Sequence, residues 1–297
     1  VGCGRWGQSY LNTLEKMDSA SIDWIVLRKS TPKLKGNYKF TYNLDKLLQQ
    51  EIIDGVIIAT PPQTHFDLAK ICIKNNVPVL LEKPFTQSYE ESLWLKKEFE
   101  KHKLICLVGY QHLFAEKYKL LKSQKLKIGQ IKAIYSIAIS DGPFRENVSI
   151  IRDWGSHEVA LALDLFDEIP TSIRINKIND SSLNPYKGIY NLQMEFSSQK
   201  KFNSVFGNQS KVKKRELFAE FNNGFIAQNN LDQAGNITIL NGEFDNLNQT
   251  ADILPLPLES VLNEFINSIK NKIFTRTLSL SVNVNKILDQ LEIKIME

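Results

Sequence analysis

Four segments of the sequence carry residues that could do chemistry or bind a cofactor, and the first is VPVLLEKPFT at residues 77–86. Its apolar run stops at Glu82, Lys83 and Pro84. A proline restricts the residue before it to an extended conformation and permits an otherwise rare cis bond. The backbone is therefore predicted to fix the direction of Lys83, as a positioned charge requires.

The second segment, IIRDWGSHEVALALDLF at residues 150–166, contains Asp153 and His157 four positions apart. On a helix these two residues share one face, where a carboxylate can orient an imidazole. Histidine is the side chain best suited to take a hydroxyl proton near neutral pH. The same spacing also fits a helix-capping pair without a catalytic role.

The third segment, VGCGRWG, fits G-x-G-x-x-G through Gly2, Gly4 and Gly7 and leads into a helical pattern. A tight glycine turn brings backbone amides against a pyrophosphate, whose charge a helix N-terminus favours. Arg5 and Trp6 lie within this loop and are further candidates for cofactor contact. The strand that normally precedes the motif is represented only by its last residue, so we expect the natural chain to continue upstream.

The end of the second predicted strand, WIVLRKS, carries Arg28 and Lys29 where an acid is usual in NAD-binding folds. Such an acid accepts hydrogen bonds from the ribose hydroxyls and would repel the additional phosphate of NADP. Arg28 and Lys29 could bind that phosphate, so the sequence favours NADP over NAD. Alternatively, both are exposed charges at a strand end.

A fourth stretch, IIATPPQTH at residues 57–65, places Thr60 and Pro61 just after a buried strand. Open α/β sheets bind ligands at this carboxyl edge, where Glu82 and Lys83 should also emerge. These residues are therefore candidate walls of a cofactor site. His65 is a further candidate, although a neutral imidazole at a helix start also fits packing or local hydrogen bonding.

Two different patterns of secondary structure are predicted to position these segments. The first hundred residues alternate short β-branched runs with helical patterns, which predicts a parallel sheet built from βαβ units. The predicted strands are 22–27, 38–42, 53–59, 77–81 and 104–108, and the predicted helices are 7–17, 44–50, 64–74 and 88–101.

Beyond residue 114 the pattern changes to a succession of alternating runs, which predicts an antiparallel sheet. The predicted strands are 130–140, 171–178, 189–196, 202–206, 217–221, 225–228 and 237–240. Helices are predicted up to about residue 124 and over 152–166, 258–269 and 280–296.

Composition fits a globular protein of 297 residues with two domains, since 42% of the residues are hydrophobic and 24% are charged. The net charge of +4 is mild, which argues against a nucleic-acid partner. The densest basic cluster, KVKKRELF at 211–218, is interpreted as a solvated sheet edge. Three separated cysteines and the lack of a leader or membrane-spanning stretch predict a cytoplasmic protein without a membrane partner, and we expect no metal site.

In combination, the motifs GCGRWG, ATPPQTH, LEKPF and DWGSH resemble the Gfo/Idh/MocA family of NAD(P)-dependent oxidoreductases. The resemblance implies an α/β fold: a Rossmann dinucleotide-binding domain over 1–112, and an α+β domain over 113–297 for substrate binding and oligomerisation. The second domain would hold a large, open, mostly antiparallel sheet. By the same resemblance Lys83, Asp153 and His157 are the catalytic residues.

The stretches GYQHLF at 109–114 and GPFRENV at 142–148 are similar to family members linked to surface polysaccharides and nucleotide sugars. The implied substrate is a small-molecule sugar, in free or nucleotide-activated form. Tyr110, Arg145 and Asn147 are the candidates for contacting its hydroxyls or phosphates.

Two other functions fit the same resemblance. A catalytically silent sensor would bind NAD(P) without reducing it, and an NAD-dependent glycosidase would oxidise its substrate only transiently. The presence of Lys83, Asp153 and His157 together argues against the sensor. The resemblance also implies a homodimer or homotetramer that forms through the sheet of the second domain.

Overall fold

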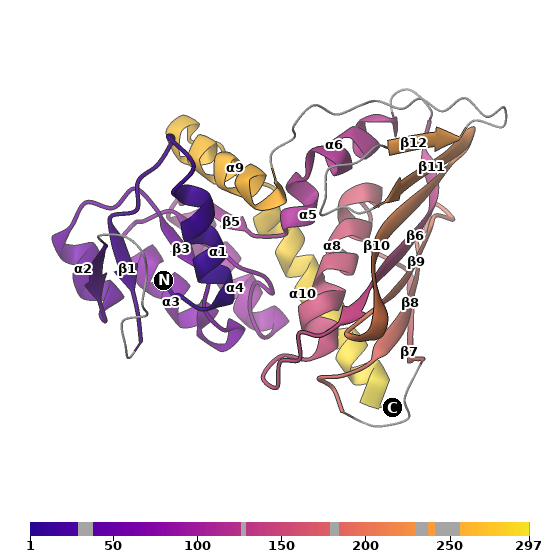
Figure 1. Ribbon diagram of the computed structural model, residues 1–297, viewed down its shortest axis with the longest axis horizontal. Coiled ribbons are helices and arrows are strands. Elements are labelled where there is room, and N and C mark those ends of the chain that lie inside the picture. Colours follow the sequence, from indigo (N-terminus) through magenta and orange to yellow (C-terminus); the bar gives the residue numbers. More distant parts are fainter. Residues whose placement is uncertain (29–37, 126–128, 179–183, 230–236, 241–255, 297) are drawn as a thin grey trace. The chain divides into compact units, whose positions relative to one another are not determined.

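The computed structural model describes residues 1–28, 38–125, 129–178, 184–229, 237–240 and 256–296 (Figure 1). The chain forms two compact units. Unit 1 comprises Val1–Tyr110 and Leu258–Asn285, and unit 2 comprises Gln111–Pro257 and Lys286–Glu297. Segment 258–285 thus groups with unit 1, whereas the sequence assigned it to the second domain.

Unit 1 contains two small sheets, and all of their strand pairs are parallel, as predicted. One sheet pairs β1 (Trp24–Val26) with β2 (Lys39–Thr41), and the other has the order β3 (Val56–Ile58), β4 (Val79–Leu81), β5 (Cys106–Val108). Between the strands lie α1 (Arg5–Leu14), α2 (Leu44–Gln50), the 3-10 turn η1 (Pro62–Thr64), α3 (His65–Lys74) and α4 (Tyr89–Lys101), and α9 (Pro257–Asn271) follows late in the chain.

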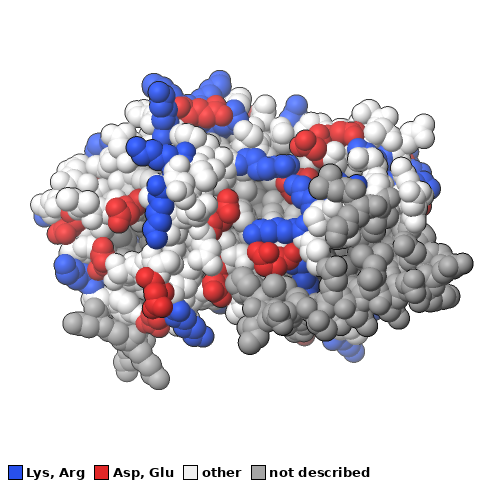
Figure 2. Space-filling model, turned by 90° about the horizontal axis from the view of Figure 1, so that it is seen from above, with Lys and Arg blue, Asp and Glu red and all other residues white. Residues whose placement is uncertain are grey.

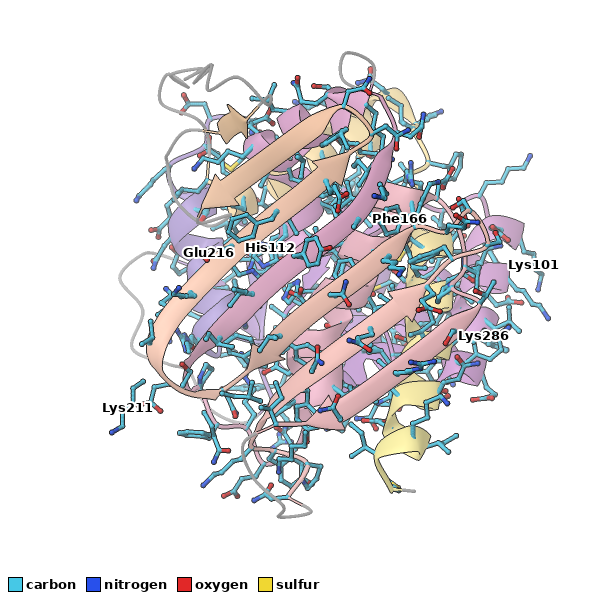
Figure 3. All side chains as sticks on the ribbon, turned by 90° about the vertical axis from the view of Figure 1, so that its right-hand side faces the viewer. Lys101, His112, Phe166, Lys211, Glu216 and Lys286 are labelled. Atoms are coloured by element: carbon cyan, nitrogen blue, oxygen red, sulfur yellow. The ribbon has the colours of Figure 1, made fainter. Side chains whose placement is uncertain are left out.

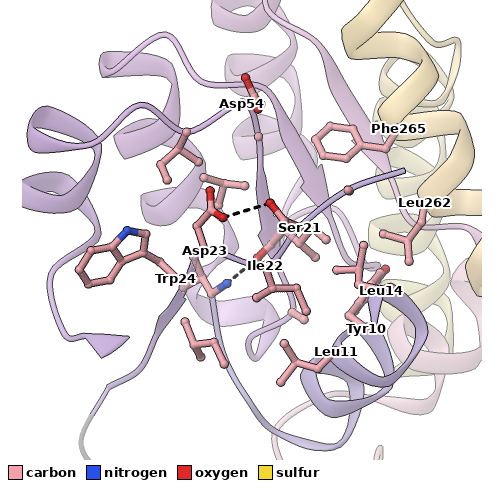
Figure 4. Close-up of a pocket in the computed structure, with 18 of the residues that line it drawn as sticks. Tyr10, Leu11, Leu14, Ser21, Ile22, Asp23, Trp24, Asp54, Leu262 and Phe265 are labelled. Atoms are coloured by element: carbon pink, nitrogen blue, oxygen red, sulfur yellow. Dashed lines mark hydrogen bonds between the residues drawn. The ribbon is translucent and has the colours of Figure 1, made fainter. Parts of the chain in front are cut away.

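A cavity of about 530 Å³ lies in unit 1 between strands β1 and β3 (Figure 4). Val1 closes one end, because its carbonyl accepts from Ala59 N at 2.9 Å while the next amide, Gly2 N, donates to Val26 O at 2.9 Å. The walls are mainly apolar and include Leu11, Leu14 and Phe265. We therefore regard the cavity as a gap between the two parallel sheets and assign no cofactor to it.

Unit 2 is built on a seven-stranded sheet with the order β12-β11-β10-β6-β9-β8-β7. Its strand pairs are antiparallel except β6 with β9, so the sheet is mixed but mostly antiparallel, as predicted. The strands are β6 (Ile131–Asp141), β7 (Ser172–Lys177), β8 (Ile189–Glu195), β9 (Lys201–Gly207), β10 (Gln209–Phe221), β11 (Gly224–Asn229) and β12 (Ile237–Leu240).

The interpretation of residues 211–218 as a sheet edge is wrong. These residues lie in β10, which pairs with β6 on one side and β11 on the other. Lys211 and Lys213 are exposed in the part of β10 between Gln209 and Lys214, where its pairing with β6 is interrupted. Arg215, in contrast, is buried. Alternating charges could not distinguish an edge strand from an inner strand with one solvated face.

Helices cover one face of this sheet, and helix α8 (Ser156–Phe166), all of whose residues are buried, packs on it (Figure 1). The other helical elements are α5 (Gln111–Phe114), α6 (Glu116–Ser123), the π-helical turn η2 (Ile151–Gly155) and α10 (Thr277–Met296), whose residues divide between the units after Asn285. In the described part of the chain, no helix crosses the opposite face, which is turned to the viewer in Figure 3.

Candidate active site

The glycine loop of unit 1 has the close backbone packing that its motif predicts. Gly2 has a φ of +85°, and a Cβ there would lie 2.6 Å from Thr60 Cγ2. A Cβ on Gly7 would lie 2.2 Å from Gly2 O, so neither position accepts a side chain. Gly4 differs, because nothing lies within 4 Å of the position of its Cβ. A ligand can therefore approach the backbone at Gly4.

The start of helix α1 fits a dinucleotide pyrophosphate. Gly4 is its N-cap and supplies no side-chain cap, so the first amides keep their capacity to bind an anion. Arg5 and Trp6 begin the helix, and Arg5 is exposed. Arg28, also exposed, follows β1, while Lys29 lies outside the described residues. The residues present fit the cofactor class that the sequence predicted.

Lys83 follows β4 and lies beside a buried carboxylate. Glu82 is 7% exposed, and its Oε1 accepts a hydrogen bond from the hydroxyl of Tyr10 at 2.6 Å. Its Oε2 accepts from the backbone N–H of Lys83 at 3.2 Å. The Lys83–Pro84 peptide bond is cis. Glu82 thus links the helix after the glycine loop to the backbone of the lysine.

His65 is fully buried and bridges two loops of unit 1. Its Nδ1 lies 2.9 Å from Pro84 O, and its Nε2 lies 3.0 Å from Thr60 O. Burial lowers the pKa of His65 although both carbonyl oxygens favour the protonated ring. The imidazole therefore ties the loop of Thr60 and Pro61 to the loop that follows Lys83, which agrees with the packing role that the sequence left open.

Asn285 anchors the same loop from helix α10. Its side-chain amide is buried and donates to Thr86 O and Ser88 O, each at 3.2 Å. No sequence motif pointed to this residue, which lies about 200 positions away in the chain. Tyr10 could have been suspected, because it lies three residues after Gly7 on the buried side of α1.

Tyr110, a predicted substrate contact, is only 1% exposed. Burial raises the pKa of its phenol well above the ordinary value, and the nearby Ser281 side chain opposes this shift. Both residues belong to unit 1. The structure therefore places Tyr110 in the packed interior of that unit.

Asp153 lies in the π-helical turn η2 of unit 2 and forms an ion pair with Arg145. Arg145 Nη1 donates to Asp153 Oδ1 at 2.8 Å, and the Asp153 side chain is only 7% exposed. Arg145 was predicted to contact substrate, but here it neutralises the carboxylate. The neighbouring Asn147 is exposed.

His157 follows η2 in helix α8 and packs against a second histidine. Its ring and that of His112 on α5 meet edge to face, with centroids 4.6 Å apart. Both rings are buried, with exposures of 8% and 4%. No spacing or motif singled out His112 as a functional residue, although it lies in the stretch GYQHLF at 109–114.

The turn that carries Asp153 is anchored to helix α10. Arg152 Nε donates to Glu292 Oε2 at 2.9 Å, and its Nη2 donates to Asp289 Oδ1 at 2.6 Å. Although burial alone would lower the pKa of Arg152, these carboxylates raise it above its ordinary value. Ser149 Oγ also donates to Glu292 at 2.5 Å.

Helix α8 is held to the sheet just beyond His157. Glu158 is fully buried, accepts from Ser204 Oγ at 2.8 Å and pairs with Arg215 at 3.3 Å. At Gly155, a Cβ would lie 3.1 Å from Phe206 Cζ, so the turn approaches the sheet closely. These contacts fix the backbone on both sides of His157.

The predicted residues therefore form two clusters. The glycine loop, Thr60, His65, Glu82 and Lys83 belong to unit 1, while Arg145, Asn147, Asp153 and His157 belong to unit 2. In unit 1 hydrogen bonds join His65 to Thr60 and Glu82 to Lys83, and in unit 2 an ion pair joins Arg145 to Asp153. That the two clusters act on one substrate remains a proposal.

Among the described residues on the face shown in Figure 2, lysine and arginine side chains are interspersed with aspartate and glutamate and form no large patch of one charge. None of the described helices combines the length and apolar character needed to cross a membrane. Among the described residues, no cluster of three or more His, Cys, Asp or Glu side chains could hold a metal ion.

Comparison with known proteins relates the chain to oxidoreductases. Residues 1–110 match the family GFO_IDH_MocA, described as an oxidoreductase family with an NAD-binding Rossmann fold. Inositol 2-dehydrogenase 1 of Mycolicibacterium vanbaalenii is 32% identical over 146 residues, which are 47% of this chain and 42% of that protein. The chain thus spans less than half the length of this curated relative.

Two solved structures share the fold. UDP-N-acetylglucosamine 3-dehydrogenase GnnA from Acidithiobacillus ferrooxidans has a TM-score of 0.76 and 18% identity, covering 87% of this chain and 83% of that one. GenD2 from gentamicin A biosynthesis, solved with NAD, has a TM-score of 0.81 and 16% identity, covering 100% and 93%. Residues 1–110 thus match the NAD-binding Rossmann part of the oxidoreductase family that the motifs predicted.

Proposed function

We propose that the protein oxidises a carbinol carbon of a sugar, or reduces the corresponding ketone, with NAD(P) as hydride carrier. The observation that carries this proposal is the position of Lys83. It follows a buried parallel strand in the family's dinucleotide-binding unit, and Glu82, His65 and Asn285 hold the surrounding loop. A surface lysine without a function would not need a loop held by hydrogen bonds from three buried side chains.

In the oxidising direction, His157 removes the proton of the substrate hydroxyl. Asp153 orients the imidazole, and Arg145 pairs with the Asp153 carboxylate at 2.8 Å. Lys83 donates a hydrogen bond to the oxygen as it becomes an alkoxide. General-base assistance of this kind typically contributes about 10²–10⁴-fold to the rate.

The backbone amides at Gly4 and the start of α1 would bind the cofactor pyrophosphate, with Thr60 and Pro61 as a wall beside it. When bound, the nicotinamide ring supplies the hydride chemistry. Arg28, which is exposed after β1, supports NADP over NAD because a guanidinium attracts the additional phosphate. We assign Lys29 the same role from its sequence position.

The substrate class rests on the relatives, which include inositol dehydrogenases and, at the level of fold, a UDP-N-acetylglucosamine dehydrogenase. A free or nucleotide-activated sugar is the substrate that these names suggest. Three free cysteines, of which Cys72 and Cys106 are buried, fit a reducing cytoplasm.

The test is a screen of polyols and nucleotide sugars for reduction of NAD or NADP, followed by the Lys83→Ala variant. We expect turnover to fall about 100-fold or more while cofactor affinity changes little. Lys101→Ala, at an exposed lysine on α4, is the control and should keep the parent rate. Unchanged turnover in Lys83→Ala would contradict the mechanism. Cofactor binding without reduction would favour the sensor, and release of free sugar without net reduction would favour the glycosidase.

The open face of the unit 2 sheet is the proposed interface between copies of the chain. Tyr135 is 44% exposed there, next to Phe218 in the register of β6 and β10. Pairing of two copies would cover this apolar surface. Light scattering should find a dimer or tetramer, and Tyr135→Glu should shift it toward the monomer. A monomeric parent protein would contradict this interface.

A further inference from the structure

Two loops of unit 2 are joined by the buried side chain of Asn208. One loop, residues 142–147, follows β6, and the other, residues 184–188, precedes β8. Asn208 is 1% exposed, and its amide donates to Tyr186 O at 2.9 Å and Pro143 O at 3.5 Å. Its Oδ1 accepts from Gly188 N at 3.2 Å. One residue thus bonds to both loops.

The backbone strengthens this junction. Gly142 N donates to Asn208 O at 2.9 Å, and Asn208 N donates to Gly188 O at 3.1 Å. The preceding Gly207 has a φ of +153°, and a Cβ there would lie 2.0 Å from Gly188 O. The end of β9 therefore approaches Gly188 more closely than a side chain would allow, and Asn208, the next residue, holds both loops to this strand end.

The joined loops present an aromatic ring and an amine at the surface. Phe144 is 49% exposed, and Lys187 Nζ lies 5.0 Å from the centroid of its ring. Both side chains are exposed, so neither is needed to fill the core. A flat aromatic surface stacks on a nucleic-acid base, and a lysine amine binds phosphate oxygens. Together they are complementary to a nucleoside diphosphate.

Both loops are also tied to the turn that carries Asp153. Arg145, the residue after Phe144, pairs with Asp153 at 2.8 Å. Pro185 O accepts a hydrogen bond from Ile150 N, directly before η2, at 2.9 Å. The acidic neighbours along the first loop are Asp141 and Glu146, which are exposed, and Arg145 balances the charge of Asp153. The pair formed by Phe144 and Lys187 therefore lies on the loops that support the proposed catalytic turn.

We propose that Phe144 and Lys187 bind the nucleoside diphosphate part of a nucleotide-activated sugar. The base stacks on the exposed part of the Phe144 ring, and Lys187 binds the diphosphate. The sugar then extends toward Asp153 and His157. This inference rests on the proposed function and narrows its substrate to the nucleotide-activated class.

Calorimetric titration of the full chain with UDP and with GDP tests the subsite without requiring turnover. We expect at least one of the two to bind, and Phe144→Ala and Lys187→Gln each to weaken that binding about tenfold. Lys70→Gln is the matched control, because the Lys70 amine lies 5.1 Å from the centroid of the Phe66 ring in unit 1. It should leave the affinity unchanged.

Absence of binding by both nucleotides, or equal affinity in the Phe144→Ala variant, would overturn the proposal. Displacement of the bound nucleotide by NADP would also overturn it, because the subsite would then belong to the cofactor. The Lys83→Ala variant tests the nucleotide subsite separately from the catalytic mechanism. It should bind the nucleotide as the parent does, so a failure of the catalytic mechanism would leave this result standing.

Discussion

The hydroxyl group of Tyr10 donates a hydrogen bond to Glu82 Oε1 at 2.6 Å, which joins helix α1 to the end of strand β4. Burial and the Glu82 carboxylate raise the pKa of Tyr10 well above its ordinary value. Because α1 begins at the glycine loop and Glu82 precedes Lys83, this bond connects two parts of the proposed cofactor site within unit 1.

Tyr10→Phe should therefore weaken both stability and cofactor binding. A buried carboxylate loses one donor, which costs about 1.5–3 kcal/mol of the free energy of unfolding. Urea denaturation measures the first effect, and fluorescence titration with NADPH measures the second.

Tyr118→Phe is the control for Tyr10→Phe, since the buried Tyr118 donates to Asp164 at 2.5 Å in unit 2. It should destabilise the protein without changing cofactor affinity. Equal effects of the two variants on NADPH binding would show that the link to Glu82 has no specific role.

His65 should make stability depend on pH. Burial holds its folded-state pKa below the ordinary 6.5, so the unfolded chain binds a proton at a pH where the folded protein does not. Stability is therefore complete above pH 6.5 and falls as the pH decreases, by up to about 1.4 kcal/mol per pH unit, until the folded-state pKa is reached. Urea unfolding at pH 7.5 and 5.5 should show a smaller difference for His65→Gln than for the parent.

His102→Gln is the control for the pH experiment, because His102 is partly exposed at the end of α4. It should leave the pH dependence nearly as it is in the parent. If His65→Gln kept the full difference between the two pH values, the titrating group would have to be another residue.

Gly155→Ala should destabilise unit 2. The backbone at Gly155 is helical, with φ −60° and ψ −29°, so alanine gains up to about 1 kcal/mol of helix propensity. However, the new Cβ would lie 3.1 Å from the fully buried ring of Phe206, and overpacking costs about 1–3 kcal/mol. We expect a net loss of about 1 kcal/mol and a lower turnover, because His157 is two residues away.

The double variant Gly155→Ala, Phe206→Leu makes room for the new methyl group. It should recover part of the turnover that Gly155→Ala loses, measured as kcat on the best substrate. A Gly155→Ala protein more stable than the parent would mean that the turn does not press on the sheet.

Arg28→Ala should change the choice of cofactor. Loss of the guanidinium should weaken NADPH binding about tenfold and leave NADH binding nearly unchanged. Fluorescence titration with both nucleotides checks this. An equal loss of affinity for NADPH and NADH would mean that Arg28 contacts a part of the site that the two cofactors share.

The sequence alone predicted the elements that depend on local pattern. Helix α2 has the predicted bounds, Leu44–Gln50, and each strand of unit 1 lies inside its predicted range. Alternation of apolar residues and turn chemistry act over a few positions, so these elements can be read from short windows. Through residue types at fixed spacing, the motifs likewise predicted the oxidoreductase family that residues 1–110 match.

The tertiary structure alone decided which distant residues meet. Asn285 bonds to Ser88, Arg152 bonds to Asp289, and Glu158 pairs with Arg215. The same reason placed β10 inside its sheet and segment 258–285 in unit 1. Such pairs form because the folded backbone brings together segments that no local pattern relates, and burial then requires each polar group to find a partner.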